Sequence, residues 1–361
     1  MILPVVSRPE RFLVTGRTST TNILNVWLER ISELTVDVSW LQILYLSTTT
    51  YLTISNQTRN YSATPERFRP LWGVIIYTFF NMKVPKLGVM AVHPTRAETL
   101  STILIIVLTS ISSALGLFRD GHYADATDHL PRIYAQDAVL LMIGVPILAI
   151  GLWFTIRGSL RGRIVWLGSL TFMVYMWTHY AFVIAYNDFF LGYVALFGFS
   201  IFTLVSGLLR TDPVLYFERL HDVVSTWIYA GFLGVAAAGL GFMWLFDIVP
   251  AVLAGELPSA IAQLGPEAAH TYVIDLAILV PCLAMAGVWL RQQRPWGYVL
   301  AGVLLVFAAL IAPALTAITV IDLIGGLEIS VPILIGTILP PLIGLVFAGT
   351  FLSMLSSETG G

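Results

Sequence analysis

The stretch HYAFVIAYNDFF, residues 179–190, gathers side chains that could do chemistry inside an otherwise apolar chain. It holds an imidazole, phenols, an amide and a carboxylate, supplied by His179, Tyr180, Tyr186, Asn187 and Asp188. Imidazole and carboxylate groups exchange protons, and phenols and amides orient them by hydrogen bonding. Such groups within apolar segments are typical of proton or cation sites in membrane proteins.

Similar side chains lie at the start of two other apolar segments. They are Tyr134, Gln136 and Asp137 in the first, and His270, Tyr272 and Asp275 in the second. We expect Asp137 to open its helix, where water reaches it, and Asp275 to lie about two turns inside. An aspartate at that depth must be neutralised or paired. The sequence offers His179 and His270 as its partners, with Tyr180 and Tyr272 as hydrogen-bond donors.

Each of these residues also has a structural interpretation. Asp137 and Asp188 could cap helices at the membrane surface, and His179 could join two helices through a hydrogen bond. Asp275, deeper in its segment, is the one for which we favour a functional role.

The loop RDGHYADATDH, residues 119–129, offers a weaker candidate for metal binding. His122, Asp125, Asp128 and His129 are ligand types that divalent metals accept. Their spacing matches no tight metal signature, so a solvated acidic loop is the preferred interpretation and we predict no metal site.

The composition places most of the chain in lipid. Of its 361 residues, 57% are hydrophobic and 11% charged, against roughly 45–50% and about 25% in soluble domains. Because Cys282 is the only cysteine, an intramolecular disulfide is excluded. No phosphate loop, GxSxG or HExxH motif is present, so the sequence favours a non-enzyme and identifies no cofactor. No polybasic surface suited to nucleic acid is found either.

A helix needs roughly 20 apolar residues to cross a bilayer, and eight segments qualify. They are 99–117, 137–156, 164–186, 189–209, 223–246, 271–290, 297–320 and 331–355. The predicted fold is therefore all-α, a polytopic transmembrane bundle of about eight spanning helices. Thr95 to Glu98 reads as a capping box before the first helix. Asp212-Pro213 reads as the start of a helix lying at the interface.

Arginine in the short connections sets the expected orientation. The turn 157–163 has three arginines, and Arg291 and Arg294 occupy a later one, whereas 187–188 and 247–270 contain no basic residue. The basic connections are expected in the cytoplasm. This predicts a multi-pass protein of the cell membrane with both termini inside, its few unpaired polar groups gathered toward the outer face.

Residues 1–89 form a different kind of sequence from the transmembrane domain at 90–361. They hold nine basic and five acidic residues, for a net charge of +4, against −6 for the rest. Two interpretations stay open: a basic N-terminal extension, or an upstream stretch that is not translated because synthesis starts at Met90.

Two similar short stretches suggest that the transmembrane domain arose by internal duplication. PILAIGLW at 146–153 resembles PCLAMAGVW at 281–289, and each follows an intramembrane aspartate and precedes a basic turn. Two halves of four helices each would have the same orientation, with the pseudo-axis along the membrane normal. Chance recurrence of Pro, Leu, Ala and Trp is the alternative.

GLFRDGHY, AQDAVLL, RGSLRGRIVWLG and the helix ending NDFFLGYVALF carry a resemblance. In this combination, residues 90–355 resemble a family of uncharacterised prokaryotic multi-pass membrane proteins of unknown function. The resemblance implies an eight-helix membrane fold and no particular reaction or substrate.

Three functions compete. The first is a transporter or permease-like bundle for an ion or small molecule, with Asp275 and Asp137 as proton or cation sites. The second is a non-catalytic sensor or assembly partner in which the polar cluster locks helix packing. The third is an outward-facing membrane enzyme or cofactor protein using His179 and His270. The expected partner is the lipid bilayer, and the sequence specifies no oligomeric state.

Overall fold

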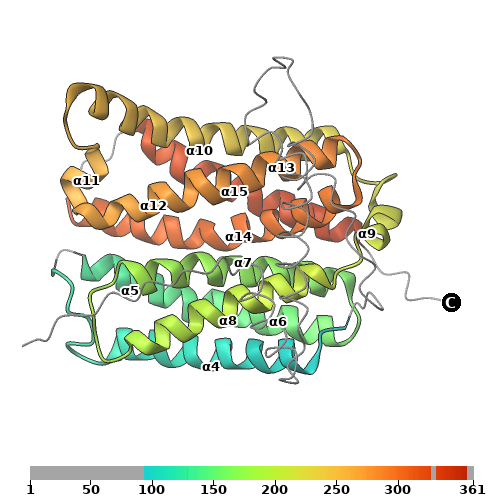
Figure 1. Ribbon diagram of the computed structural model, residues 1–361, viewed down its shortest axis with the longest axis horizontal. Coiled ribbons are helices and arrows are strands. Elements are labelled where there is room, and N and C mark those ends of the chain that lie inside the picture. The colour runs from blue at the N-terminus through green and yellow to red at the C-terminus, as the bar shows by residue number, and fades with distance from the viewer. Residues whose placement is uncertain (1–92, 128, 327–330, 356–361) are drawn as a thin grey trace, which may run out of the picture. The chain divides into compact units, whose positions relative to one another are not determined.

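The computed structural model of the protein describes residues 93–127, 129–326 and 331–355 (Figure 1). These described residues form helices and connections, with no strand among them. The predicted extension at 1–89 and the candidate ligand Asp128 lie outside the described residues. The all-α prediction is therefore confirmed for the part of the chain that the structure describes.

The first group of helices comprises α4 (Arg96–Phe118), α5 (Leu130–Val139), the π-helical segment η2 (Leu140–Gly144), α6 (Val145–Ile156), α7 (Leu160–Phe182) and α8 (Phe190–Leu209). The short helix α9 (Pro213–Leu220) follows. The second group comprises α10 (Thr226–Ala254), α11 (Ser259–Leu264), η3 (Pro266–Ala268), α12 (Ala269–Ile274), the π-helical segment η4 (Asp275–Leu279), α13 (Val280–Arg291), α14 (Pro295–Ile324) and α15 (Val331–Met354). We call the first group the N-terminal half and the second the C-terminal half.

Helix starts follow local sequence. The Thr95 hydroxyl accepts a hydrogen bond from the Glu98 amide, and the Glu98 carboxylate accepts one from the Thr95 amide, so the predicted capping box is confirmed. Asp212 accepts from the Val214 amide and Pro213 opens α9, as the Asp-Pro pair predicts.

Six helical stretches are long and apolar enough to cross a membrane, which indicates a protein associated with a lipid bilayer. They are Arg96–Phe118, Leu130–Ile156, Phe190–Leu209, Thr226–Ala254, Ala269–Arg291 and Pro295–Ile324. Two predicted segments are not among them. The third became α7, most of whose residues are buried within the bundle. The last became α15, whose apolar stretch is the shorter Ile338–Met354.

Within the N-terminal half, α7 packs against α6 and α8, and α4 packs against α8. Within the C-terminal half, α13 packs against α10 and α14, and α14 packs against α15 (Figure 1). The halves meet where α14 packs along α7 and α5. Gly168 of α7 allows this close approach, because a Cβ there would overlap the side chain of Val306.

Helix boundaries in the two halves repeat at one interval. Segment η4 begins 135 residues after η2 (275 against 140), α13 begins 135 after α6 (280 against 145) and α14 begins 135 after α7 (295 against 160). Gly162 and Gly297 stand at the same interval. A Cβ at Gly162 would overlap the end of α6, and one at Gly297 the end of α13. Both halves therefore share a tight turn between their second and third long helices.

Candidate functional site

Asp137 is the centre of a buried polar cluster in the N-terminal half. Its side chain is 0% exposed. One carboxylate oxygen accepts a hydrogen bond from the Tyr123 hydroxyl at 2.6 Å, and the other accepts from Tyr180 at 3.0 Å. The Cα of Gly116 in α4 leaves the space for this carboxylate, since a Cβ there would overlap it. The expectation that Asp137 opens its helix and meets water is wrong, because α5 begins at Leu130 and carries Asp137 inward.

A second layer of polar groups covers this cluster. The Tyr193 hydroxyl accepts a hydrogen bond from Asn187 Nδ2 at 3.2 Å and lies 3.3 Å from His122 Nε2. The rings of Tyr180 and Tyr193 pack edge to face at 5.5 Å, and Trp177 stacks beside Tyr193. Asn187, a residue of the opening motif, thus contributes through Tyr193 rather than by touching Asp137.

His122 and Tyr123 belong to the connection between α4 and α5 but are buried. Burial, reinforced by the positive charge of Arg119, lowers the pKa of His122 below its ordinary value of 6.5, while Asp188 acts in the opposite direction. Burial and the neighbouring Asp137 carboxylate raise the pKa of Tyr123 far above its ordinary value. Tyr123 therefore keeps its proton and remains a donor to Asp137.

Asp275 forms a separate site. It is 4% exposed, and its oxygens accept hydrogen bonds from the Tyr175 hydroxyl at 3.2 Å and the Trp244 indole nitrogen at 2.9 Å. Tyr175 belongs to α7 of the N-terminal half, whereas Trp244 belongs to α10. Asp275 therefore lies where the two halves meet.

The histidines predicted to pair with Asp275 face each other instead. The rings of His179 and His270 lie 5.6 Å apart. Neither ring nitrogen of His270 has a hydrogen-bond partner within the described part of the chain. Tyr272 donates to Asp247 at 2.5 Å, and Asp247 also accepts from the Ser259 amide.

The residues predicted to surround Asp275 therefore belong to separate sites. Tyr180 serves Asp137 and Tyr272 serves Asp247, and neither donates to Asp275. The reason is geometric: Tyr180 is buried on the face of α7 turned toward α5, while Tyr175, more than one turn earlier, reaches Asp275. Tyr175 lies one helical turn from His179 on α7 and was not among the donors predicted from the sequence.

The candidate metal residues that the structure describes, His122, Asp125 and His129, do not assemble. Among the described residues no group of three or more His, Cys, Asp or Glu side chains could hold a metal. His122 approaches Tyr193, and Asp125 accepts a hydrogen bond from the Ala185 amide at 3.0 Å. His129 takes the position preceding α5. The loop is folded onto the cluster around Asp137 rather than open around an ion.

Two ion pairs lie at this same end of the bundle. Arg132 of α5 contacts Asp322 of α14 at 2.5 Å with both side chains largely buried, which joins the halves. Asp188 contacts Arg119 at 3.2 Å, and its side chain is 83% exposed. Asp188 is therefore a surface partner and not a member of either buried site.

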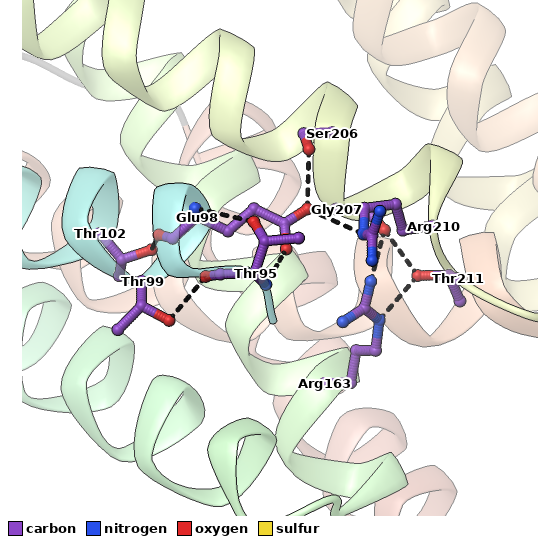
Figure 2. A network of polar contacts seen from close by, with 9 residues as sticks. All are labelled: Thr95, Glu98, Thr99, Thr102, Arg163, Ser206, Gly207, Arg210 and Thr211. Atoms are coloured by element: carbon purple, nitrogen blue, oxygen red, sulfur yellow. Dashed lines mark hydrogen bonds and ion pairs between the residues drawn. The ribbon is translucent and has the colours of Figure 1, made fainter. Parts of the chain in front are cut away.

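Charged groups are also buried at the opposite end of the N-terminal half, where none had been predicted (Figure 2). Glu98 is 3% exposed and accepts a hydrogen bond from Ser206 at 2.7 Å, with Arg210 at 3.9 Å. Arg163 is 1% exposed and donates to Thr211 and to the carbonyl of Gly207. Both groups are hydrogen-bonded, so they form a paired network that the sequence did not predict, and the predicted gathering of unpaired polar groups toward one face stays a prediction.

Comparison of the chain with protein-family models, curated proteins and solved structures finds no match. The assignment of a function therefore depends on the geometry of these sites.

Two features of that geometry bear on chemistry. Both buried aspartates accept hydrogen bonds from neutral donors. Each lies at or within one turn of a π-helical segment, η2 for Asp137 and η4 for Asp275. Single-turn π segments are frequent at functional sites. The arrangement can bind a proton or a small cation, and neither site presents a nucleophile activated by a neighbouring base.

Proposed function

We propose that the protein is a transporter or permease-like membrane protein in which Asp137 and Asp275 bind a proton or a cation. The observation that carries this proposal is the neutral surroundings of two buried carboxylates. Within the described residues, the ion pairs involve other acids, and neither Asp137 nor Asp275 has a basic partner.

An ionised carboxylate without a counter-charge is costly at membrane depth, by about 2.5–3.5 kcal/mol for Asp at a helix centre. Phenol and indole donors offset part of this cost but supply no charge. A bound proton or cation would supply it. The π-helical segments and the prolines that follow, Pro146 and Pro281, interrupt regular helix hydrogen bonding beside the carboxylates. Interrupted helices at membrane depth are a feature of transporter sites.

The proposal also specifies the number of membrane-spanning helices and their orientation. The eight predicted segments correspond to long helical stretches, and the shared 135-residue interval supports an internally duplicated four-plus-four bundle. The basic turn at 157–163 then places the Arg163 end in the cytoplasm, with both termini inside and the Asn187 turn outside. The resemblance to prokaryotic multi-pass proteins implies the eight-helix membrane fold, and the arginine distribution supports the proposed orientation in the cell membrane.

Reconstitution tests the function directly. The full chain would be placed in liposomes containing a pH-sensitive dye, and proton flux driven by an imposed membrane potential would be measured. We expect Asp275→Asn and Asp137→Asn to reduce the flux to the level of empty liposomes, because the amide cannot carry the exchangeable charge. Asp188→Asn, at an exposed carboxylate, is the matched control and should leave flux unchanged.

The same assay would be repeated with sodium and potassium gradients to include metal cations. Wild-type flux of protons and cations in both buried-site variants would refute the proposal. Correct folding of each variant is checked by its elution as a single species and by its melting temperature.

A second candidate, a non-catalytic sensor or assembly partner, is favoured by one observation. Both oxygens of Asp137 are already hydrogen-bonded to tyrosines from separate segments, which ties those segments together. Interhelical hydrogen bonds average about 0.6 kcal/mol each. In this case Asp137→Asn would lower the melting temperature while flux remained absent in wild type and variant alike. No feature of the sites specifically favours the enzyme or cofactor alternative.

A further inference from the structure

The buried faces of α4 and α8, which pack against each other and against α7, are polar along most of their length and are here together called the α4–α8 seam. The buried residues of α4 are Glu98, Thr102, Ile105, Thr109, Ser112, Ser113 and Gly116. Those of α8 are Tyr193, Leu196, Ser200, Thr203 and Gly207. Steps of three and four, with Ser112 and Ser113 adjacent, place each set on one helix face. In an apolar chain, the buried faces of these two helices are therefore lined mainly by hydroxyl-bearing and small residues.

Contacts at both ends fix how the two faces align. Ser206 of α8 donates to Glu98 near the start of α4, as Figure 2 shows. Near the other end, the Ser112 hydroxyl lies beside the Tyr193 hydroxyl. The helices are therefore antiparallel, and Thr109 and Ser200 fall between these two contacts. The seam runs from the Glu98 network to the cluster around Asp137.

Hydroxyl groups in the middle of the seam lack hydrogen-bond partners. Thr109 and Ser200 are each 0% exposed, and their hydroxyl oxygens have no partner within the described residues. Serine and threonine inside a helix commonly donate to the carbonyl four residues earlier. Ser110, one position from Thr109, does so at 2.8 Å to Ile106. Thr109 and Ser200 differ from Ser110 in leaving their hydrogen-bonding capacity unused, which costs free energy when no ligand uses it.

We propose that the α4–α8 seam is a path for a monovalent alkali cation, which the hydroxyl oxygens coordinate and Asp137 attracts. This rests on the proposed transport function and assigns its substrate class and route. Hydroxyl and carboxylate oxygens are ligands that hard cations prefer, and a divalent ion usually takes several carboxylates. Asp137 is the acid at one end, and Ser113 lies beside it.

The ends of the seam are closed in this structure. At one end Glu98 is engaged by Ser206 and approached by Arg210. At the other, Tyr123 and Tyr180 occupy both oxygens of Asp137. Passage therefore requires that these contacts separate in turn, which matches a carrier with alternating access rather than an open channel. Ile105 and Leu196 are the apolar interruptions between the ends.

Sodium uptake into proteoliposomes tests the path. Ser200→Ala should reduce uptake roughly fivefold, since one cation ligand is lost. Thr109→Val should act similarly, and the two changes together should reduce it further. Ser110→Ala is the matched control on the same helix, because its hydroxyl serves its own backbone, and uptake should remain within about twofold of wild type.

A labelling experiment separates a path from simple packing. Single cysteines at position 109, 110 or 200, in a Cys282→Ala background, would be exposed to a small cationic thiol reagent with and without sodium. Thr109→Cys and Ser200→Cys should react, and sodium should slow the reaction. Ser110→Cys should show no protection by sodium.

The outcomes are distinguishable. Normal sodium uptake in Ser200→Ala and Thr109→Val, with loss in Asp137→Asn, would overturn the seam and leave the proposed function standing. Proton flux without sodium or potassium uptake would overturn the alkali cation as the substrate. Unreactive cysteines at positions 109 and 200 would show that the seam is only a packing surface. Absence of any flux in the wild type, with reactive and sodium-protected seam cysteines, would contradict transport but not cation binding.

Discussion

Three helix starts repeat in the two halves at a 135-residue interval, but the first long helix of each half buries different side chains. In the N-terminal half, α4 buries a stripe of mostly hydroxyl-bearing residues. In the C-terminal half, α10 buries Tyr229, Leu233, Ala237 and Gly241. Within the described residues, Thr109 of α4 and Ser200 of α8 are buried hydroxyls without partners, and α10 has none.

The two aspartates, Asp137 and Asp275, also differ between the halves, both in position and in their hydrogen-bond donors. At the 135-residue interval the position matching Asp137 holds Tyr272, and the position matching Asp275 holds Leu140. The acids are thus displaced by one turn relative to each other. Asp137 is enclosed within its own half, whereas Asp275 takes a donor from each half, Tyr175 and Trp244. A change in how the halves meet would alter the surroundings of Asp275 more than those of Asp137.

The largest expected effect concerns the packing around two helical glycines, one in each half. Gly116→Ala should lower the free energy of unfolding by about 1–3 kcal/mol, the usual cost of overpacking. The added Cβ would lie 2.6 Å from the Tyr123 hydroxyl and overlap the Asp137 carboxylate. Gly239→Ala in α10 is the control, because nothing lies within 4 Å of its added Cβ. Denaturation in detergent measures both, and equal losses would remove this distinction between the halves.

A smaller effect should distinguish the hydrogen bonds that the two aspartates accept. Tyr123→Phe removes the 2.6 Å hydrogen bond to Asp137, and Tyr175→Phe removes the 3.2 Å bond to Asp275. We expect losses of about 1.7 and about 0.6 kcal/mol, the upper and average values for membrane hydrogen bonds. Melting temperatures of the two variants, measured under identical conditions, give the order. A greater loss from Tyr175→Phe would show that Asp275 is the more tightly held acid.

The smallest effect is a pH dependence confined to the N-terminal half. Because the pKa of His122 is lowered in the folded protein, the unfolded chain binds a proton first as the pH falls. Its contribution to stability is therefore complete above its ordinary pKa of 6.5 and declines as the pH falls below that value. Melting temperature against pH should fall less steeply in His122→Gln than in wild type. Superimposable profiles would contradict this assignment.

Much of the local structure could be predicted from the sequence. The apolar segments match the long helices, the Thr95 capping box and the Asp212-Pro213 start are present, and the repeated Pro, Leu, Ala and Trp pattern lies in helices with matching boundaries. These features depend on residues within a few positions of each other. Membrane insertion and helix capping act over that same range, so local sequence is sufficient to specify them.

The partners of the polar residues were decided by tertiary structure. In a helix that is apolar on every side, spacing does not indicate which face turns toward a neighbour. Tyr175 and Trp244 could therefore not be assigned to Asp275, nor Tyr123 to Asp137, before the helices were packed. The sequence determined which segments are helices and which of them carry acids. Their rotation and depth, which only packing sets, determined what each acid binds.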